Sequence, residues 1–368
     1  MKINKVELTH VRLPLNEPFE ISSGVIFEKD CIIVKVYTDE LVGIGESSPM
    51  SAPFYSSETV DTCIHMLKDF IIPQLLGRNI NKIENIDDIF SNIRGNNFAK
   101  AGIEIALWDF LSKYANKPLF EFIGGKNKEI PWKISIGIKS SLDELLASIE
   151  KFLKYGCKSI KIKIKKGWDI EPIKKIREKF GNIDLTVDAN SHYTLEDIKI
   201  FEEIDNYKLT QIEQPLHYKD LYDHYILQNR ISTPICLDES IDSLTSCKNA
   251  LDIGCCKIIN IKIQRVGGIK KAIAIHDMCR SKGIPVWIGQ MPESGVGSFF
   301  GLALCSLDDV LYASDIAPSD VYFKEDIIDS NIQMGNLGNL RLPTGIGVGC
   351  NLDEKQIDKF KVTKMKFE

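Results

Sequence analysis

The alternation of hydrophobic and polar positions divides the chain into two parts with different rhythms. The first part begins with three strand-like runs of alternating residues and continues with three runs of helical periodicity. The expected strands cover residues 3–15, 31–37 and 41–46, and the expected helices cover residues 57–77, 83–93 and 98–114. Strands followed by helices are typical of a segregated α+β domain, which we place at residues 1–125.

After Gly125 the chain alternates between short β-branched runs and helical patterns. The expected strands are residues 133–138, 159–163, 184–188, 209–213, 234–238, 257–262 and 285–288. Strictly alternating strands and helices indicate a parallel sheet, and without a dinucleotide-binding fingerprint they favour a closed α/β barrel over an open sheet. We place this barrel at residues 126–342 and expect residues 343–368 to return to the first domain.

Composition and charge narrow the class of protein. Hydrophobic residues make up 44% and charged residues 26%, and no apolar run is long enough to span a membrane. A start broken up by charges excludes a signal peptide, so we expect a cytoplasmic protein. A net charge of -5 gives no general attraction to nucleic acid or anionic membranes. The ten cysteines lie in apolar segments without Cys-x-x-Cys spacing, which predicts buried, reduced thiols.

A charged residue ends each of the five middle strands. These residues are spaced 25, 25, 25 and 24 positions apart, and they are Lys163, Asp188, Glu213, Asp238 and Lys262. The carboxyl ends of barrel strands form one mouth, so we expect these side chains to converge there. Three acids offer only hard oxygen ligands and would repel one another without a divalent cation. We expect Mg²⁺, with Mn²⁺ as a substitute.

The two lysines that bracket the acids indicate proton-transfer chemistry. Lys163 and Lys262 are four strands apart, half-way around an eight-stranded barrel, and are expected to face each other across the metal. This arrangement suits removal of a proton next to a carboxylate, because the metal stabilises the enediolate that forms when a lysine takes the α-proton. Lys161 and Arg265 are expected to lower the pKa of Lys163 and Lys262 respectively, by disfavouring their charged forms.

Each motif also has a structural interpretation when taken alone. The Lys161-Ile-Lys163 run is typical of a solvated edge strand, and the segments after Asp188 and Asp238 are typical of turns and helix caps. Helix capping does not require charges at the ends of five successive strands. The shared spacing therefore favours the catalytic interpretation.

These motifs resemble the enolase superfamily, muconate-lactonizing subgroup, and within it the o-succinylbenzoate synthases and N-acylamino acid racemases. The resemblance covers nearly the whole chain and is carried by residues 159–163, 187–190, 212–215, 236–240 and 259–268. It implies a (β/α)7β modified TIM barrel with an N-terminal α+β capping domain. It also implies Mg²⁺ held by Asp188, Glu213 and Asp238, and acid/base roles for Lys163 and Lys262.

The resemblance further suggests residues that contact the substrate or support the ligands. They are Tyr55, Ser135, Asn190, Glu239, Asn260, Arg265, Met291, Glu293 and Ser294. Two positions depart from the family pattern. Ala317 stands where dipeptide epimerases carry the second aspartate that holds the substrate ammonium, which counts against free-amine dipeptides. Pro292 replaces the usual leucine, which affects the local strand end and the fit of the substrate.

The resemblance leaves two activities in competition. Dehydration by o-succinylbenzoate synthase, in the menaquinone pathway, needs Lys163 as base and Lys262 only as a cation, whereas racemisation of N-succinylamino acids needs both as bases. Arg265 favours racemisation because it would lower the pKa of Lys262, so we expect both reactions. We also expect a small carboxylate substrate and a homo-oligomer. The alternatives are a racemase as main role, a dipeptide epimerase, a muconate cycloisomerase, or a metal-binding scaffold without catalysis. Two opposed amines argue against the scaffold.

Overall fold

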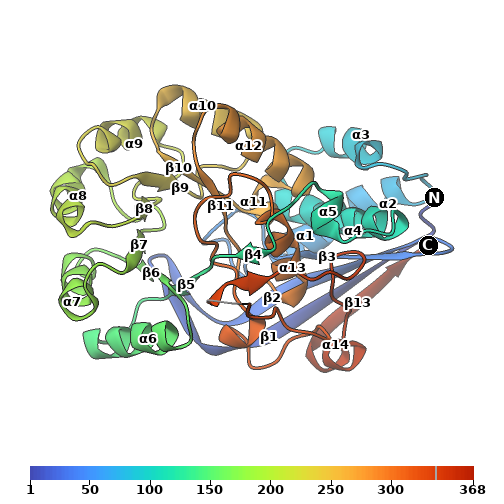
Figure 1. Ribbon diagram of the computed structural model, residues 1–368. Coiled ribbons are helices and arrows are strands. Elements are labelled where there is room, and N and C mark those ends of the chain that lie inside the picture. Colours follow the sequence, from blue (N-terminus) through green and yellow to red (C-terminus); the bar gives the residue numbers. More distant parts are fainter. Residues whose placement is uncertain (336–337) are drawn as a thin grey trace.

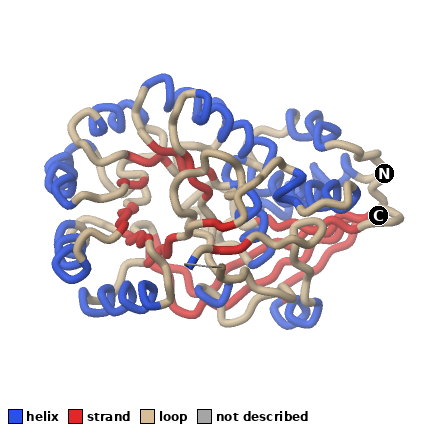
Figure 2. The backbone as a smooth tube through the Cα atoms, in the orientation of Figure 1, coloured by secondary structure: helices blue, strands red, loops and turns tan. Residues whose placement is uncertain are grey.

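The computed structural model describes residues 1–335 and 338–368, and an antiparallel sheet and a curled parallel sheet form its two main layers (Figures 1 and 2). The antiparallel sheet has the order β13 (Lys361–Phe367), β1 (Lys5–Ile21), β2 (Gly24–Tyr37), β3 (Val42–Ser47). The first two strands run further than the sequence predicts, because the β1–β2 hairpin continues past a break in register between Pro14 and Phe19. Pairing of β13 with β1 brings the end of the chain back to this sheet.

Helices cover one face of the antiparallel sheet. They are α1 (Val60–Met66), the π-helical turn η1 (Leu67–Ile71), α2 (Ile72–Leu75), η2 (Ile83–Ile86), α3 (Asp87–Ser91), α4 (Asn97–Tyr114) and α5 (Leu119–Phe122). The single helix predicted for residues 57–77 is divided, because Pro73 lacks the N–H that would continue the α-helical ladder. Helix α4 is buried on most faces, as predicted, and packs closely on β3. A Cβ at Gly45 would lie 2.5 Å from the Gly102 carbonyl oxygen.

The second half of the chain forms seven parallel strands with helices outside them (Figure 1). The strands are β5 (Lys133–Ile136), β6 (Ser159–Lys163), β7 (Asp184–Asp188), β8 (Gln211–Glu213), β9 (Ile235–Leu237), β10 (Ile258–Ile261) and β11 (Val286–Ile288). The helices are α6 (Leu142–Lys154), α7 (Ile170–Phe180), η3 (Leu195–Asp197), α8 (Ile198–Ile204), η4 (Asp205–Tyr207), α9 (Leu221–Gln228), α10 (Leu244–Ile253), α11 (Ile263–Val266), α12 (Ile269–Ser281) and α13 (Gly295–Leu304). All seven predicted strands are present.

An eighth extended segment closes the ring between β11 and β5. Val310 forms a parallel bridge with Val286 of β11, and Ser314 forms one with Trp132, next to β5. The Lys133 amide donates to the Ser314 carbonyl at 2.7 Å. The predicted (β/α)7β barrel with an α+β cap is therefore confirmed. The remaining elements are β4 (Glu129–Ile130), η5 (Ser319–Val321), β12 (Leu340–Arg341) and α14 (Glu354–Phe360).

Two predictions from composition can be compared with the structure. All ten cysteines are buried and free, which confirms the interpretation as buried, reduced thiols. None of the helices within residues 1–335 and 338–368 is both long and apolar enough to cross a lipid bilayer.

Candidate active site

Three of the strand-end residues share one register, and two are staggered. Lys163, Asp188 and Glu213 pair directly across β6, β7 and β8. Glu213 pairs with Cys236 rather than with Asp238, which lies one residue beyond the end of β9. Strands of a closed barrel tilt and shear, so equivalent functional positions step along the strands around the ring. The predicted common register is therefore correct for three residues and needs this stagger for Asp238 and Lys262.

The amines of this ring pair with its carboxylates. The Lys163 ammonium donates to Asp188 at 2.5 Å, and the Lys262 ammonium donates to Asp238 at 2.9 Å. Lys161 donates to Glu213 at 3.0 Å. All three lysines are buried, and a buried charge is tolerated only when it is paired. The side chains that the sequence predicts to converge thus lie together at the carboxyl ends of the strands.

A small cavity of about 50 Å³ lies where the barrel meets the cap. Lys161, Lys163 and Lys262 line it from the barrel, together with Asn190. The cap contributes Ile21, Gly24, Ile26, Met50, Phe54 and Tyr55. These residues come from the β1–β2 hairpin and from the loop that follows β3. Two amines from strands four positions apart in the sheet, those of Lys163 and Lys262, therefore line one cavity.

The charges around the cavity are strongly coupled. Burial would raise the pKa of Glu213, but Lys161, Lys163 and Lys262 lower it to about 2, so this carboxylate is ionised. Burial favours a lower pKa for Lys262, but Tyr55 and the surrounding carboxylates, Glu213 first among them, hold that pKa above its ordinary value. The net pKa of Lys262 is therefore raised rather than lowered, and the contribution of Arg265 to it stays a prediction.

Tyr55 and Arg265 fix the position of Lys262. The Lys262 ammonium donates to the Tyr55 hydroxyl oxygen at 3.3 Å, and the Arg265 guanidinium donates to the same oxygen at 3.2 Å. Arg265 also pairs with Asp238 and donates to the Asn260 carbonyl at 2.6 Å. A residue of the cap thus contacts the reactive side of the barrel directly.

The donor atoms at this mouth fit a hard divalent cation. Among the described residues, no three acidic, histidine or cysteine side chains form a compact cluster, because Asp188, Glu213 and Asp238 each face an ammonium group. Beside them, Glu239 Oε2 and Asn190 Oδ1 are buried without a hydrogen-bond partner in the described chain. Burial and the neighbouring Asp188 raise the pKa of Glu239 to about 7. Glu239 and Asn190 thus offer hard oxygen atoms without a partner in the part of the chain that the structure describes, which is the kind of donor that Mg²⁺ binds.

Comparisons with known proteins agree with this geometry. A model described as "Mandelate racemase / muconate lactonizing enzyme, N-terminal domain" matches residues 3–124, and one described as "Enolase C-terminal domain-like" matches residues 144–356. The chain belongs to the enolase superfamily. The resemblance predicted from the strand-end motifs is therefore confirmed.

Relatives within the superfamily carry two kinds of name. The o-succinylbenzoate synthase of Geobacillus kaustophilus is 42% identical, over 98% of this chain and 96% of the relative. The N-succinylamino acid racemase of Thermus thermophilus is 36% identical, over 96% of this chain and 95% of the relative. Both relatives are enzymes, and so is this chain.

Solved structures extend the comparison to the fold. An enolase superfamily member from Listeria innocua superposes with a TM-score of 0.95 at 36% identity, covering 100% of this chain and 99% of the other. A dipeptide epimerase from Cytophaga hutchinsonii, solved with Mg and the dipeptide D-Ala-L-Val, gives a TM-score of 0.93 at 26% identity, covering 100% of both chains.

Asp315 is a residue of the site that the sequence analysis did not predict. Its carboxylate accepts from Lys161 at 2.7 Å and from the Gln290 amide at 3.0 Å, and it lines the cavity. Asp315 belongs to the segment that closes the barrel, which forms isolated bridges rather than a continuous strand. That segment lacks a β-branched run, so its hydrophobic pattern does not mark it as a strand.

Lys133 and Trp287 form a second group next to Lys161 that sequence reasoning missed. The Lys133 ammonium lies 3.4 Å from the centroid of the Trp287 ring, and the Lys161 ammonium lies 5.0 Å from it. Burial and the nearby charge of Lys161 lower the pKa of Lys133 to about 8. A lysine at the start of a strand has no sequence pattern that distinguishes it from an exposed one.

The remaining predicted residues fall into two groups. Ser135 and Met291 line the cavity, and Asn260 donates to Glu213 at 2.8 Å. Glu293 and Ser294 do not line it. They lie at the junction with the cap, where the Ser294 amide donates to Glu46 at 3.1 Å and Glu293 accepts from the Met291 amide at 2.7 Å.

Glu293 makes stability depend on pH. Burial, reinforced by the neighbouring Glu46, raises the pKa of Glu293 to about 8. Glu293 therefore keeps its proton in the native state up to about pH 8, whereas in the unfolded chain it loses its proton near pH 4.5. The free energy of unfolding consequently falls as pH rises from about 4.5 to about 8. We expect the Tm of Glu293→Gln, which cannot ionise, to gain on that of the wild type as pH rises from about 5 to about 8. A constant difference in Tm, measured by differential scanning calorimetry, would contradict this assignment.

Proposed function

We propose that this enzyme removes the proton α to the carboxylate of a small substrate, as an o-succinylbenzoate synthase that also racemises N-succinylamino acids. The observation that carries the proposal is the pair of amines, Lys163 and Lys262, which line one cavity from strands four positions apart. The names of the relatives support both reactions. A binding module would have no need for two such amines.

The carboxylates of Asp188, Glu213 and Asp238 would hold Mg²⁺, or Mn²⁺ as a substitute. The bound cation supplies Lewis-acid stabilisation of the negative charge that develops on the substrate carboxylate. Asn260 holds the Glu213 carboxylate by its amide at 2.8 Å, and Asn190 holds Glu239 at 2.9 Å. These contacts orient the oxygens around the reacting carboxylate.

Lys163 acts as the base in both reactions. Its ammonium must lose its proton before it can take the α-proton from the substrate. In dehydration the same amine then gives that proton to the departing hydroxyl, so that water leaves from the face on which the proton was removed. Lys262 remains a cation near the negative intermediate.

Racemisation uses Lys262 as the second acid/base. One lysine removes the α-proton from one face, and the other returns a proton to the opposite face. Tyr55 and Arg265 hold the Lys262 ammonium in place for this step. The apolar residues of the cap, including Phe54 and Ile21, exclude water from the exchanging amines.

Dipeptide epimerisation is the second candidate, and the structural neighbour from Cytophaga hutchinsonii favours it by its fold. A free-amine dipeptide needs a negative group for its ammonium. Ala317 is buried and apolar, and Asp315 is already paired with Lys161. These contacts favour substrates whose amine is acylated.

Deuterium wash-in tests the proposed chemistry. In D₂O with Mg²⁺, we expect the enzyme to exchange the α-proton of both enantiomers of an N-succinylamino acid, because each enantiomer presents its proton to one of the two lysines. The exchange is followed by proton NMR and mass spectrometry. An enzyme that dehydrates the o-succinylbenzoate precursor without any α-exchange would refute the racemase half, and an enzyme that does neither would refute the proposal.

A further inference from the structure

Gln214 lies where the segments that follow β7, β8 and β9 meet. Its backbone is in the left-handed region, with φ at 38°, which a residue other than glycine adopts only when its surroundings hold it there. The Gln214 amide donates to the Cys236 carbonyl at 2.8 Å, and the Gln214 carbonyl accepts from the Ser191 amide at 2.8 Å. The main chain of Gln214 therefore ties the end of β8 to β9 and to the loop after β7.

The side chain of Gln214 extends this link into the loop after β9. It is fully buried, and its carbonyl oxygen accepts from the backbone amides of Asp238 at 2.9 Å and Ser240 at 3.2 Å. Its amide nitrogen donates to the Ser240 hydroxyl at 2.8 Å and to the Leu216 carbonyl at 3.2 Å. One side chain thus fixes the backbone at Asp238 relative to Glu213, the residue that precedes Gln214.

His224 determines which way the side-chain amide of Gln214 points. The imidazole is buried, and its Nδ1 donates to the Asp220 carbonyl, which leaves Nε2 as an acceptor in the neutral ring. Burial lowers the pKa of His224 to about 4, in agreement with a neutral ring. Nε2 accepts from the Leu216 amide at 3.3 Å and lies 3.4 Å from the Gln214 amide nitrogen. With the amide turned round, Gln214 would point its NH₂ group at two backbone N–H donors and its oxygen at an acceptor.

The loop after Asp188 is strained in the same way as the segment after Glu213. Asn190 and Ser191 are left-handed, with φ at 44° and 64°. Strain of this kind persists only where other contacts determine the backbone, and it is concentrated at ligand sites. The bond from the Ser191 amide to the Gln214 carbonyl is one such contact, so both strained segments are held together.

We propose that Gln214 is the positioning residue that holds the carboxylates of Asp188, Glu213 and Asp238 at the spacing a divalent cation needs, and that His224 keeps Gln214 in the orientation this requires. The inference rests on the proposed function, since it takes Mg²⁺ as the ion at this mouth. Mg²⁺ demands a nearly ideal octahedral geometry, so a small shift of one loop weakens its binding. Neither Gln214 nor His224 lines the catalytic cavity, and neither takes part in proton transfer.

Titration of the protein with Mg²⁺ alone tests the proposal. We expect Gln214→Met, which has a similar size but cannot form these hydrogen bonds, to raise the Kd for Mg²⁺ about 10–100-fold, as is typical when a group that orients metal ligands is lost. His224→Leu is expected to raise the Kd as well. His224→Gln, whose amide oxygen can accept in place of Nε2, is expected to restore most of the affinity. Isothermal titration calorimetry measures the Kd, and the two variants at position 224 decide the test if Gln214→Met does not fold.

Gln228→Met is the matched control, because Gln228 is also a buried glutamine that bonds to the backbone beside β9. It donates to the Ile231 carbonyl at 3.4 Å and to the Thr233 carbonyl at 3.2 Å, and it accepts from the Ile235 amide at 2.7 Å. Ile235 begins β9, at the end of the strand away from the mouth. Gln228→Met is expected to lower the Tm of the Mg²⁺-free protein, as Gln214→Met does, but to leave the Kd for Mg²⁺ unchanged.

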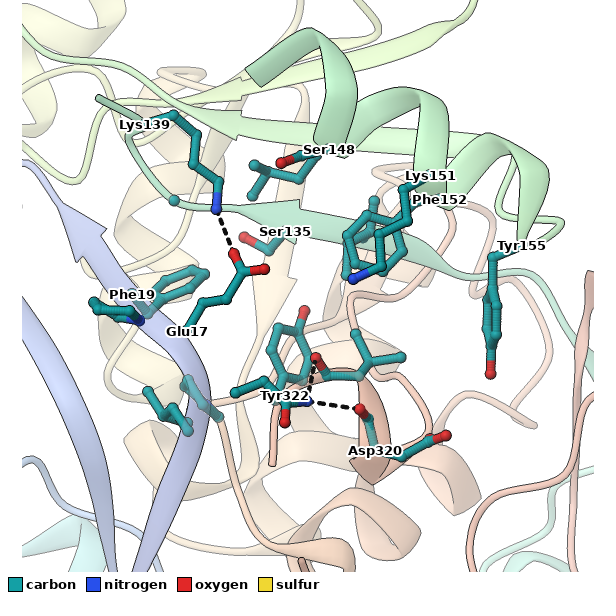
Figure 3. A pocket seen from close by; sticks show the side chains of 18 residues that line it. Glu17, Phe19, Ser135, Lys139, Ser148, Lys151, Phe152, Tyr155, Asp320 and Tyr322 are labelled. Atoms are coloured by element: carbon teal, nitrogen blue, oxygen red, sulfur yellow. Dashed lines mark hydrogen bonds and ion pairs between the residues drawn. The ribbon is translucent and has the colours of Figure 1, made fainter. Parts of the chain in front are cut away.

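A second control loosens the mouth beside β5. A pocket of about 220 Å³ adjoins the catalytic cavity there, and Lys139 pairs with Glu17 of the β1–β2 hairpin at 2.6 Å (Figure 3). Glu17→Gln removes the charge from this pair without touching the loops that carry the three acids. The Kd for Mg²⁺ is therefore expected to stay as in the wild type.

The outcomes separate this inference from the proposed function. An unchanged Kd in Gln214→Met, or an equal rise in Gln228→Met or Glu17→Gln, would refute the role of Gln214 while leaving the proposed function intact. Equal values of Kd in His224→Leu and His224→Gln would refute the role of His224. A wild type that does not bind Mg²⁺ would refute the metal-assisted chemistry of the proposed function and, with it, this inference.

Discussion

Replacement of Lys163 with alanine is expected to lower turnover by about 10²–10⁴-fold in both reactions, because the variant lacks the general base. The fold and the binding of Mg²⁺ are expected to persist. Asp188, the partner of Lys163 in the structure, also lies 3.6 Å from the Lys161 ammonium and therefore keeps a positive neighbour. Steady-state assays measure the loss, circular dichroism reports the fold, and isothermal titration calorimetry measures the binding of Mg²⁺.

Lys158→Ala is the control for this experiment. Lys158 is exposed and directly precedes β6, the strand that ends at Lys163. Its replacement therefore removes an amine near the same strand but not from the cavity. We expect its activity to equal that of the wild type. Undiminished activity of Lys163→Ala would refute the role assigned to Lys163.

Replacement of Lys262 with arginine is expected to separate the two reactions. Arginine keeps a positive charge near the intermediate but cannot lose its proton at any working pH, so it cannot serve as a base. Racemisation is expected to fall by about 10²–10⁴-fold, whereas dehydration is retained. Polarimetry follows the first reaction and ultraviolet absorbance the second.

The matched control for Lys262→Arg is Lys257→Arg, at an exposed position just before the same strand, β10. It is expected to change neither reaction. An equal loss of both activities in Lys262→Arg would mean that Lys262 has the same role in each reaction. The assignment of Lys262 as a base in racemisation and only a cation in dehydration would then be wrong.

The sequence predicts the barrel well because its buried parallel strands are short β-branched runs. In Ser159–Lys163, isoleucines alternate with polar residues, and Lys163, the last residue of the run, belongs to the site. The charged residues at the strand ends therefore predict both the parallel barrel and the proton-transfer site. The division into residues 1–125, 126–342 and 343–368 stays a prediction.

Other parts depend on contacts that sequence patterns do not record. The segment around Ser314 closes the barrel through isolated bridges, so neither it nor Asp315 shows a strand pattern. The stagger at Asp238 follows from the tilt of strands in a closed ring, which equal spacing along the chain does not reveal. The raised pKa of Lys262 depends on how many carboxylates surround it in space.

Exchange of the α-proton by two variants tests the opposed amines most directly. Lys163→Ala and Lys262→Ala are incubated with each enantiomer of an N-succinylamino acid in D₂O, and incorporation at Cα is measured by NMR. We predict that each variant still exchanges one enantiomer and loses the other, and that the two variants retain opposite enantiomers. Loss of exchange with the same enantiomer in both variants would contradict the account, because the two amines would then act on one face.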